Sequence, residues 1–247
     1  MAKPILELTN FSVFYRERGR GLFSRSTMHE VVRGLSFKLN QGEILGLVGE
    51  SGCGKSTLAR GILGLEPDCS GQVIHHSNYP QMVFQDPYSS LNPRMTVERI
   101  VEEPFIISGR YEKPERRRRV VEMLQLVGLD NRFLSRYPRE LSGGQRQRVS
   151  IAAAIIGRPQ VLIADEPVSA LDATTQTQIL DLLLELHSKL NFSILLISHN
   201  LSVVEYMCSR VMIMKSGELI ESGLPEMIFA NPQHEYTQQL IAASMGD

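Results

Sequence analysis

The chain has 247 residues, the length of one large domain or of a domain with a modest insertion. Hydrophobic residues make up 43% and charged residues 21% of it, a balance that excludes a disordered chain and one that lies mainly within a membrane. Its 26 basic and 27 acidic residues give a net charge of −1, which argues against a nucleic-acid partner. The three cysteines form no CxxC pair, and no signal peptide or run of roughly 18 apolar residues is present, so we expect neither a zinc ribbon nor a membrane span.

The N-terminal part of the chain predicts strands. Residues 5–8 and 31–39 alternate between apolar and polar side chains, as half-buried strands do. Between them, the Gly- and Arg-rich stretch 16–27 predicts an exposed loop. Gln41-Gly42 predicts a turn, and the continuous apolar run Ile44–Val48 is typical of a strand buried on both faces of a parallel sheet.

The middle of the chain, residues 86–148, is predicted to be mostly helical. Candidate helices are 95–103 and 115–128, and prolines punctuate the region. In the second helix, one apolar face is expected from Val120, Val121, Leu124 and Val127. The four arginines 116–119 cover all sides of a helix, which favours a solvated helix start, with contact to an anionic partner as the alternative.

The C-terminal half predicts parallel strands. Residues 161–164 and Ser193–Ser198 are short apolar runs, and residues 174–190 between them carry apolar side chains at helical spacing. A strand, helix and strand in this order form a βαβ unit. The sequence therefore predicts an α/β fold with a mostly parallel sheet and a helical insertion.

One segment matches the phosphate-binding pattern G-x-x-x-x-G-K-[ST], after a predicted strand and before a predicted helix. It reads Gly49-Glu50-Ser51-Gly52-Cys53-Gly54-Lys55-Ser56. Glycines let successive backbone N–H groups face a polyphosphate, and the helix N-terminus adds its positive end. We expect Lys55 to reach the β- and γ-phosphates and the Ser56 hydroxyl to bind Mg²⁺.

Two carboxylates follow the apolar strand in VLIADE. The strand would fix Asp165 and Glu166 at the carboxyl edge of the sheet, where ligands bind in such folds. Asp165 is expected to hold Mg²⁺, and Glu166 to act on the attacking water as base or orienter. The alternative is a pair of acids that caps a helix before Pro167.

The pentapeptide Leu141-Ser142-Gly143-Gly144-Gln145 resembles the signature of ATP-binding-cassette ATPases and lies between the two segments above, as it does in that family. Further motifs of the family appear in order along the chain. They are Tyr15 as the aromatic that stacks on adenine, Gln85 of the Q-loop, Ser169 and Asp172 of the D-loop, and His199 as the switch histidine. Phe11 or Phe14 is an alternative to Tyr15.

The resemblance implies a P-loop NTPase (RecA-like) core with a mostly parallel sheet, an N-terminal antiparallel β-subdomain and a helical subdomain. The core would comprise residues 1–85 and 158–247, and the helical signature subdomain residues 86–157. The cofactors implied are ATP and Mg²⁺. ATP would contact Tyr15 and residues 49–57, which include Thr57. Mg²⁺ would be held by Ser56, Gln85 and Asp165, and catalysis carried by Lys55, Gln85, Glu166 and His199.

The family pattern also implies a head-to-tail dimer. ATP would lie between the P-loop of one subunit and Ser142, Gly143 and Gly144 of the other, and its hydrolysis would release the dimer. Intact motifs argue against a partner that binds ATP without hydrolysing it. A soluble ABC ATPase of DNA repair or translation remains the alternative function.

Residues 83–97 and 234–241 (HEYTQQLI) resemble the peptide/nickel importer branch of the family. That branch implies two integral membrane permease subunits, a second homologous ATPase and an extracytoplasmic solute-binding protein. The chain would sit peripherally on the cytoplasmic face of the inner membrane, with a groove near residues 86–97 for a permease helix. Its activity would energise uptake of peptides or of nickel and metal chelates.

The sequence departs from that branch in two respects. Residues 71–85 are short, which predicts a trimmed β-subdomain, and the C-terminal tail is short, which tilts the cargo slightly toward nickel. His75 and His76 suggest either metal binding or, with no third ligand evident, a turn. Cys53 is expected to react with thiol reagents, or to be only a small filler in the P-loop.

Overall fold

The computed structural model describes residues 3–17, 27–77 and 80–244. By internal packing the chain divides into two units, residues 1–79 with 193–247, and residues 80–192. Within the described ranges, no helix has both the length and the apolar character needed to cross a membrane.

The first unit contains an antiparallel sheet with strand order β2-β1-β4. Its strands are β1 (Pro4–Glu17), β2 (Thr27–Asn40) and β4 (Cys69–His75). The expected strands 5–8 and 31–39 lie within β1 and β2, and the antiparallel β-subdomain is confirmed. The loop expected at 16–27 begins later than predicted because β1 continues to Glu17, and residues 18–26 lie outside the described part of the chain.

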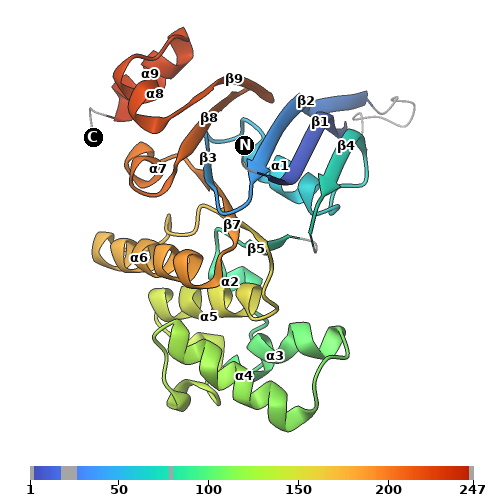
Figure 1. Cartoon of the computed structure of the whole chain (residues 1–247), viewed down its shortest axis with the longest axis vertical. Coiled ribbons are helices and arrows are strands. Elements are labelled where there is room, and N and C mark those ends of the chain that lie inside the picture. The colour runs from blue at the N-terminus through green and yellow to red at the C-terminus, as the bar shows by residue number, and fades with distance from the viewer. Residues whose placement is uncertain (1–2, 18–26, 78–79, 245–247) are drawn as a thin grey trace. The chain divides into compact units, whose positions relative to one another are not determined.

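The same unit contains a second set of strands in the order β7-β3-β8-β9 (Figure 1). β3 (Ile44–Val48) pairs in parallel with β7 (Ser193–Ser198) and β8 (Arg210–Lys215), and β9 (Glu218–Gly223) is antiparallel to β8. Every residue of β3 and β7 is buried, as the continuous apolar runs predict. The helices of this unit are α1 (Lys55–Ile62), α7 (Leu201–Met207), α8 (Pro225–Ala230) and α9 (Glu235–Ser244).

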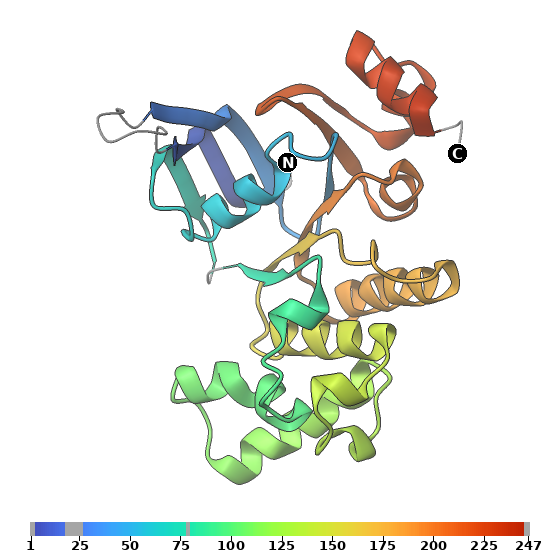
Figure 2. The same cartoon turned by 180° about the vertical axis from the view of Figure 1, so that it is seen from behind.

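The second unit is mostly helical, as predicted for residues 86–148 (Figure 2). Two short strands, β5 (Gln81–Val83) and β6 (Val161–Asp165), pair in parallel. The helices are α2 (Pro87–Ser90), α3 (Val97–Ile107), α4 (Lys113–Leu126), α5 (Gly143–Ile155) and α6 (Ala173–Leu190), with 3-10 turns at Asn131–Phe133 and Pro138–Glu140.

The helices of this unit differ in detail from the sequence prediction. The candidate 95–103 is α3, which begins only after Thr96, because the Thr96 side chain accepts a hydrogen bond from Arg99 N and caps the helix. In α4, Met123 is buried where Val121 was expected, and Val121 is half-buried.

The four arginines of α4 are all engaged with nearby carboxylates. Arg116 pairs with Glu102 at 3.3 Å and Arg117 with Glu98 at 3.5 Å. Arg118 and Arg119 both reach Glu115, at 2.7 and 2.8 Å. These ion pairs favour the solvated helix start over contact with an anionic partner.

Candidate functional site

The phosphate-binding segment lies in the first unit, between β3 and α1. α1 begins at Lys55 after Gly54, whose φ of 109° is accessible to glycine but strained for other residues. At Gly49 there is no room for a side chain, since a Cβ there would lie 2.2 Å from the backbone oxygen of Met214. No side chain caps the N-terminus of α1, so its first N–H groups remain available to an anion.

Lys55 is folded onto this loop. It is 5% exposed, and its Nζ donates to the carbonyl oxygens of Gly49 at 2.7 Å and Glu50 at 2.9 Å. Its ammonium group is therefore held at the loop by two neutral carbonyl oxygens. A phosphate oxygen is negatively charged and accepts a stronger hydrogen bond from the ammonium, so it would replace them.

Cys53 belongs to the same loop and is 8% exposed. Burial raises the pKa of its thiol, and the ammonium of Lys55, 3.8 Å from Sγ, offsets part of that rise. Because the thiolate is the reactive form, this environment favours the filler interpretation of Cys53 over the reactive one.

The C-terminal part of the chain supplies further contacts to the loop. Gly217 N donates to the carbonyl oxygen of Cys53 at 3.0 Å, and the Tyr236 hydroxyl accepts from Glu50 N at 3.0 Å. Sequence reasoning missed both residues. The motif HEYTQQLI contains Tyr236, but it gave no indication that this side chain reaches residue 50.

Tyr15 lies on β1 with its hydroxyl turned toward α1 and the turn that follows it. It donates to Glu66 Oε1 at 2.8 Å, accepts from Arg60 Nη2 at 2.9 Å and lies 3.3 Å from Thr57 Oγ1. The alternative Phe11 is 3% exposed and packs over Gly61, so it belongs to the core. Tyr15 is thus placed next to the end of the P-loop, which Phe11 is not.

His199 follows β7 directly and is exposed. The next residue, Asn200, caps α7 by accepting hydrogen bonds from Ser202 N and Val203 N. The histidine is therefore held between a buried strand and a capped helix, at the carboxyl end of the strand.

In the second unit, β6 ends in Asp165, which is 4% exposed. Glu166 follows with a φ of 46°, and Gln85 Nε2 donates to Glu166 Oε2 at 2.8 Å. The structure thus brings together two residues that are 81 positions apart. The alternative of a helix-capping acid pair is wrong, because the next helix, α6, is capped by Asp172 instead.

The pentapeptide 141–145 forms the start of α5. Leu141 is buried, and Ser142 and Gln145 form a capping box in which each side chain accepts from the other's backbone N–H. A Cβ on Gly144 would lie 2.6 Å from Thr175 Cγ2. Thr175 in turn donates from its N and Oγ1 to Asp172, and these hydrogen bonds hold the pKa of the Asp172 carboxyl below its usual value.

No group of three or more His, Cys, Asp or Glu side chains able to hold a metal ion occurs among the residues that the structure describes. His76 lies 2.7 Å from Glu7 Oε1, and His75 is half-buried, with a pKa that burial lowers. The histidine pair therefore gives no support to a metal site of its own.

Comparison with known proteins gives consistent matches. A family model described as ABC transporter matches residues 32–169. The chain is 42% identical to the dipeptide transport ATP-binding protein DppF of Haemophilus influenzae, over 98% of this chain and 78% of that protein. It is 44% identical to the oligopeptide transport ATP-binding protein AppF of Bacillus subtilis, again over 98% and 78%.

Solved structures share the fold. The ATP-binding cassette MJ0796, in a dimeric post-hydrolysis state bound to ADP and Pi, matches with a TM-score of 0.76 and 28% identity over 89% of this chain and 98% of that one. The protein cbiO1 of Clostridium perfringens, part of the ABC transporter complex cbiONQ, matches with a TM-score of 0.77 and 28% identity over 93% and 92%.

Proposed function

We propose that this chain, which belongs to the ABC transporter family, is the subunit that hydrolyses ATP to drive peptide uptake through partner membrane subunits. One observation carries the proposal: the similarity to ATP-binding proteins of dipeptide and oligopeptide transport extends over 98% of the chain. Because those relatives are named for peptides, we place peptides ahead of nickel or metal chelates as the cargo. The soluble repair or translation ATPase is not favoured.

ATP binding is assigned to the first unit. The free N–H groups at the start of α1 and the ammonium of Lys55 supply the positive charge that a triphosphate needs, within residues 49–57. Tyr15 is proposed to stack on adenine, with its ring oriented through the hydrogen bonds of its hydroxyl to Glu66 and Arg60.

Hydrolysis is assigned to Glu166 with Gln85, His199 and Lys55. Glu166 would accept the proton of the attacking water or orient it, and the amide of Gln85 holds the Glu166 carboxylate until substrate arrives. His199 would hold the γ-phosphate, while Lys55 stabilises the charge of the transferred phosphoryl group.

The donors proposed for Mg²⁺ are the Ser56 hydroxyl, the Gln85 side-chain carbonyl and the Asp165 carboxylate. All three are hard oxygen ligands, the kind that Mg²⁺ prefers. When bound, the ion would neutralise charge on the phosphate oxygens.

The signature segment is proposed to act on the ATP of a second ATPase subunit. Ser142, Gly143 and Gly144 stand at the N-terminus of α5, a 13-residue helix whose positive end would face the γ-phosphate in trans, and Ser169 and Asp172 would line the same interface. We expect that second ATPase to be a homologous but different chain.

A hollow of about 300 Å³ in the second unit is proposed to receive a permease helix. Its lining includes Phe84, Ile100 and Ile107, and Ile107 is 80% exposed, a large apolar surface to leave in water. Two permease subunits and an extracytoplasmic binding protein would complete the transporter. The chain would then lie at the cytoplasmic face of the inner membrane.

We propose a core of residues 1–85 and 158–247 and a signature subdomain of residues 86–157. Internal packing divides the chain at other positions, near 80 and 193, because β5 and α6 pack against α5 and β6 pairs with β5. Limited proteolysis with and without Mg·ATP would show whether the protease cuts near residues 85 and 157, as proposed, or near residues 80 and 193.

The substitution Glu166→Gln tests the catalytic assignment. We expect ATP affinity to be kept, while turnover falls by about 10²–10⁴-fold, the usual contribution of a general base. Calorimetry measures nucleotide affinity and phosphate release measures turnover. Glu185→Gln, at an exposed residue of α6, is the matched control. Turnover close to that of the unaltered chain would refute the role of Glu166.

The transport assignment is tested by co-purification. The chain, tagged at its C-terminus, is recovered from mildly solubilised membranes and its companions are identified by mass spectrometry. Integral membrane proteins together with a second cassette ATPase are expected. Recovery of ribosomes or DNA-bound proteins without a membrane subunit would overturn the importer in favour of the soluble alternative.

A further inference from the structure

The motif HEYTQQLI has no part in the function proposed above, yet it forms an ordered start to α9. His234 Nδ1 accepts from Tyr236 N at 3.0 Å and caps the helix. The Glu221 carboxylate of β9 accepts from Gln233 N at 2.9 Å and from His234 N at 3.3 Å. Two consecutive residues before α9 are thereby anchored to the sheet of the first unit.

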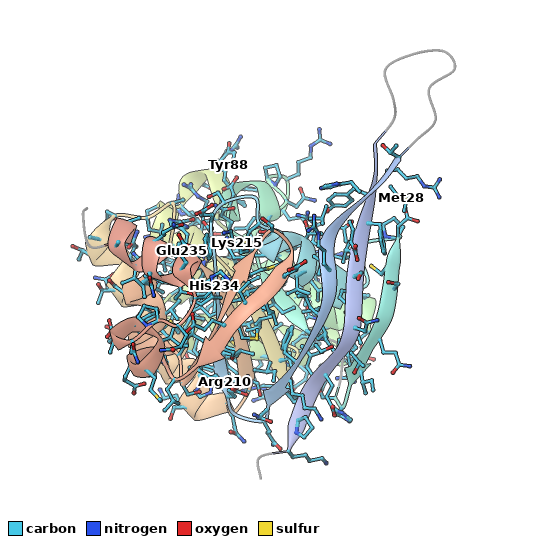
Figure 3. All side chains as sticks on the ribbon, turned by 90° about the horizontal axis from the view of Figure 1, so that it is seen from above. Met28, Tyr88, Arg210, Lys215, His234 and Glu235 are labelled. Atoms are coloured by element: carbon cyan, nitrogen blue, oxygen red, sulfur yellow. The ribbon has the colours of Figure 1, made fainter. Side chains whose placement is uncertain are left out.

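This anchoring places Tyr236 over the P-loop. Its side chain is 3% exposed, and its hydroxyl accepts the Glu50 N–H at 3.0 Å. Lys215, at the end of β8, holds its Nζ 4.7 Å from the centroid of the Tyr236 ring. Figure 3 labels Lys215, the last residue of β8, and Glu235, the first residue of α9.

Glu50 stands where the loop holds its lysine. The Glu50 carbonyl oxygen is one of the two acceptors of Lys55 Nζ, at 2.9 Å, and it also accepts from Cys53 N at 3.3 Å. Tyr236 binds the N–H of that same residue, so Glu50 is held through both its backbone N–H and its carbonyl. Burial raises the pKa of Tyr236, so the group that accepts the Glu50 N–H is a neutral hydroxyl.

We infer that Tyr236 is a positioning residue of the nucleotide site, which fixes the Glu50 end of the P-loop from the C-terminal helix. The inference rests on the proposed function, because it takes residues 49–57 to be the ATP site. Without the hydroxyl, the Glu50 N–H loses its partner and the loop must be ordered by the nucleotide itself. The free energy needed to order the loop then reduces the free energy of nucleotide binding.

The test is Tyr236→Phe in the full chain, which keeps the ring and its contact with Lys215 and removes only the hydroxyl. We expect the Kd for Mg·ATP, measured by calorimetry, to rise about fivefold, the effect of one ordinary hydrogen bond. The binding stoichiometry and the kcat at saturating ATP should stay close to those of the unaltered chain. Tyr206→Phe is the matched control, since it removes the hydroxyl of a tyrosine that is 56% exposed on α7.

A purely structural role of Tyr236 would lower the stoichiometry and the melting temperature and leave Kd unchanged, and that result would overturn the inference. Amide exchange at Glu50 in the unaltered chain is a second measurement that requires no variant: slow exchange supports the inference, and rapid exchange contradicts it. Absence of Mg·ATP binding by the unaltered chain would refute the proposed function itself. Normal binding with an unchanged Kd in the variant would refute the positioning role alone.

Discussion

Two glycine-rich segments of this chain, residues 49–54 and 141–144, each lead into a helix N-terminus, but they are built in opposite ways. Before α1, the N-cap is Gly54, which has no side chain to satisfy the first N–H groups. Before α5, the N-cap is Ser142, whose capping box with Gln145 satisfies the backbone N–H groups of these two residues. The P-loop is thus an open anion site, whereas in the signature segment side chains already occupy two of the backbone donors at the helix start.

The two segments also differ in how they are fixed. The P-loop is held by distant parts of the first unit, including Gly217 and Tyr236. The signature segment is held mostly by its own side chains, with Thr175 of α6 against Gly144. We therefore expect substitutions in the P-loop to lower ATP affinity and the free energy of unfolding more than equivalent substitutions in the signature segment do.

The largest effect is expected for Lys55→Ala. It removes the ammonium group held at the loop carbonyls, and a charged hydrogen bond to phosphate of about 3 kcal/mol corresponds to a loss of about a hundredfold in ATP affinity. Calorimetric titration with Mg·ATP measures it. An affinity equal to that of the unaltered chain would mean that the open helix N-terminus binds phosphate unaided.

A smaller effect, on stability, is expected for Gly49→Ala. Its Cβ would lie 2.2 Å from a backbone oxygen, which cannot move aside as a side chain can, so we expect a loss of about 2–3 kcal/mol in the free energy of unfolding. Gly144→Ala is the matched variant, because its Cβ would meet only the methyl group of Thr175 at 2.6 Å. Denaturant unfolding compares the two, and equal losses would remove the distinction between the segments.

The smallest effect is expected for Ser142→Ala. Loss of the N-cap of α5 should lower the free energy of unfolding by about 1 kcal/mol. ATP affinity of the isolated chain should not change, because the proposed partner of Ser142 is nucleotide on another subunit. Thr174→Ala, an exposed residue of α6, serves as the control. Weaker ATP binding by the Ser142 variant alone would contradict the assignment of this segment to a site in trans.

Much of the fold follows from the sequence for a simple physical reason. The runs Ile44–Val48 and Ser193–Ser198 are predicted to the residue, because strands buried on both faces carry continuous apolar runs, and the second run is closed at each end by a buried serine. The expected start of α3 misses by two residues, because the capping hydrogen bond of Thr96 decides it and several polar residues nearby would serve as well.

The candidate site likewise has a part that the sequence predicts and a part that it does not. The P-loop was predictable because its chemistry is local: glycines, a lysine and a helix start, in one stretch of eight residues. The bonds from Tyr236 to Glu50 and from Gln85 to Glu166 were not, because they join residues 186 and 81 positions apart. Such contacts depend on how strands and helices pack, which no local pattern encodes.

The bond between Tyr236 and Glu50 also bears on the time at which the site is completed. The P-loop is made early in synthesis, whereas the tyrosine that holds its Glu50 end follows 186 positions later. Long-range contacts form late because the intervening chain must first be ordered. Since domains begin to fold during synthesis, a nascent chain that stops short of α9 has its phosphate-binding sequence but lacks the hydroxyl that binds Glu50. The nucleotide site of this chain is therefore finished only when its C-terminal helix has docked.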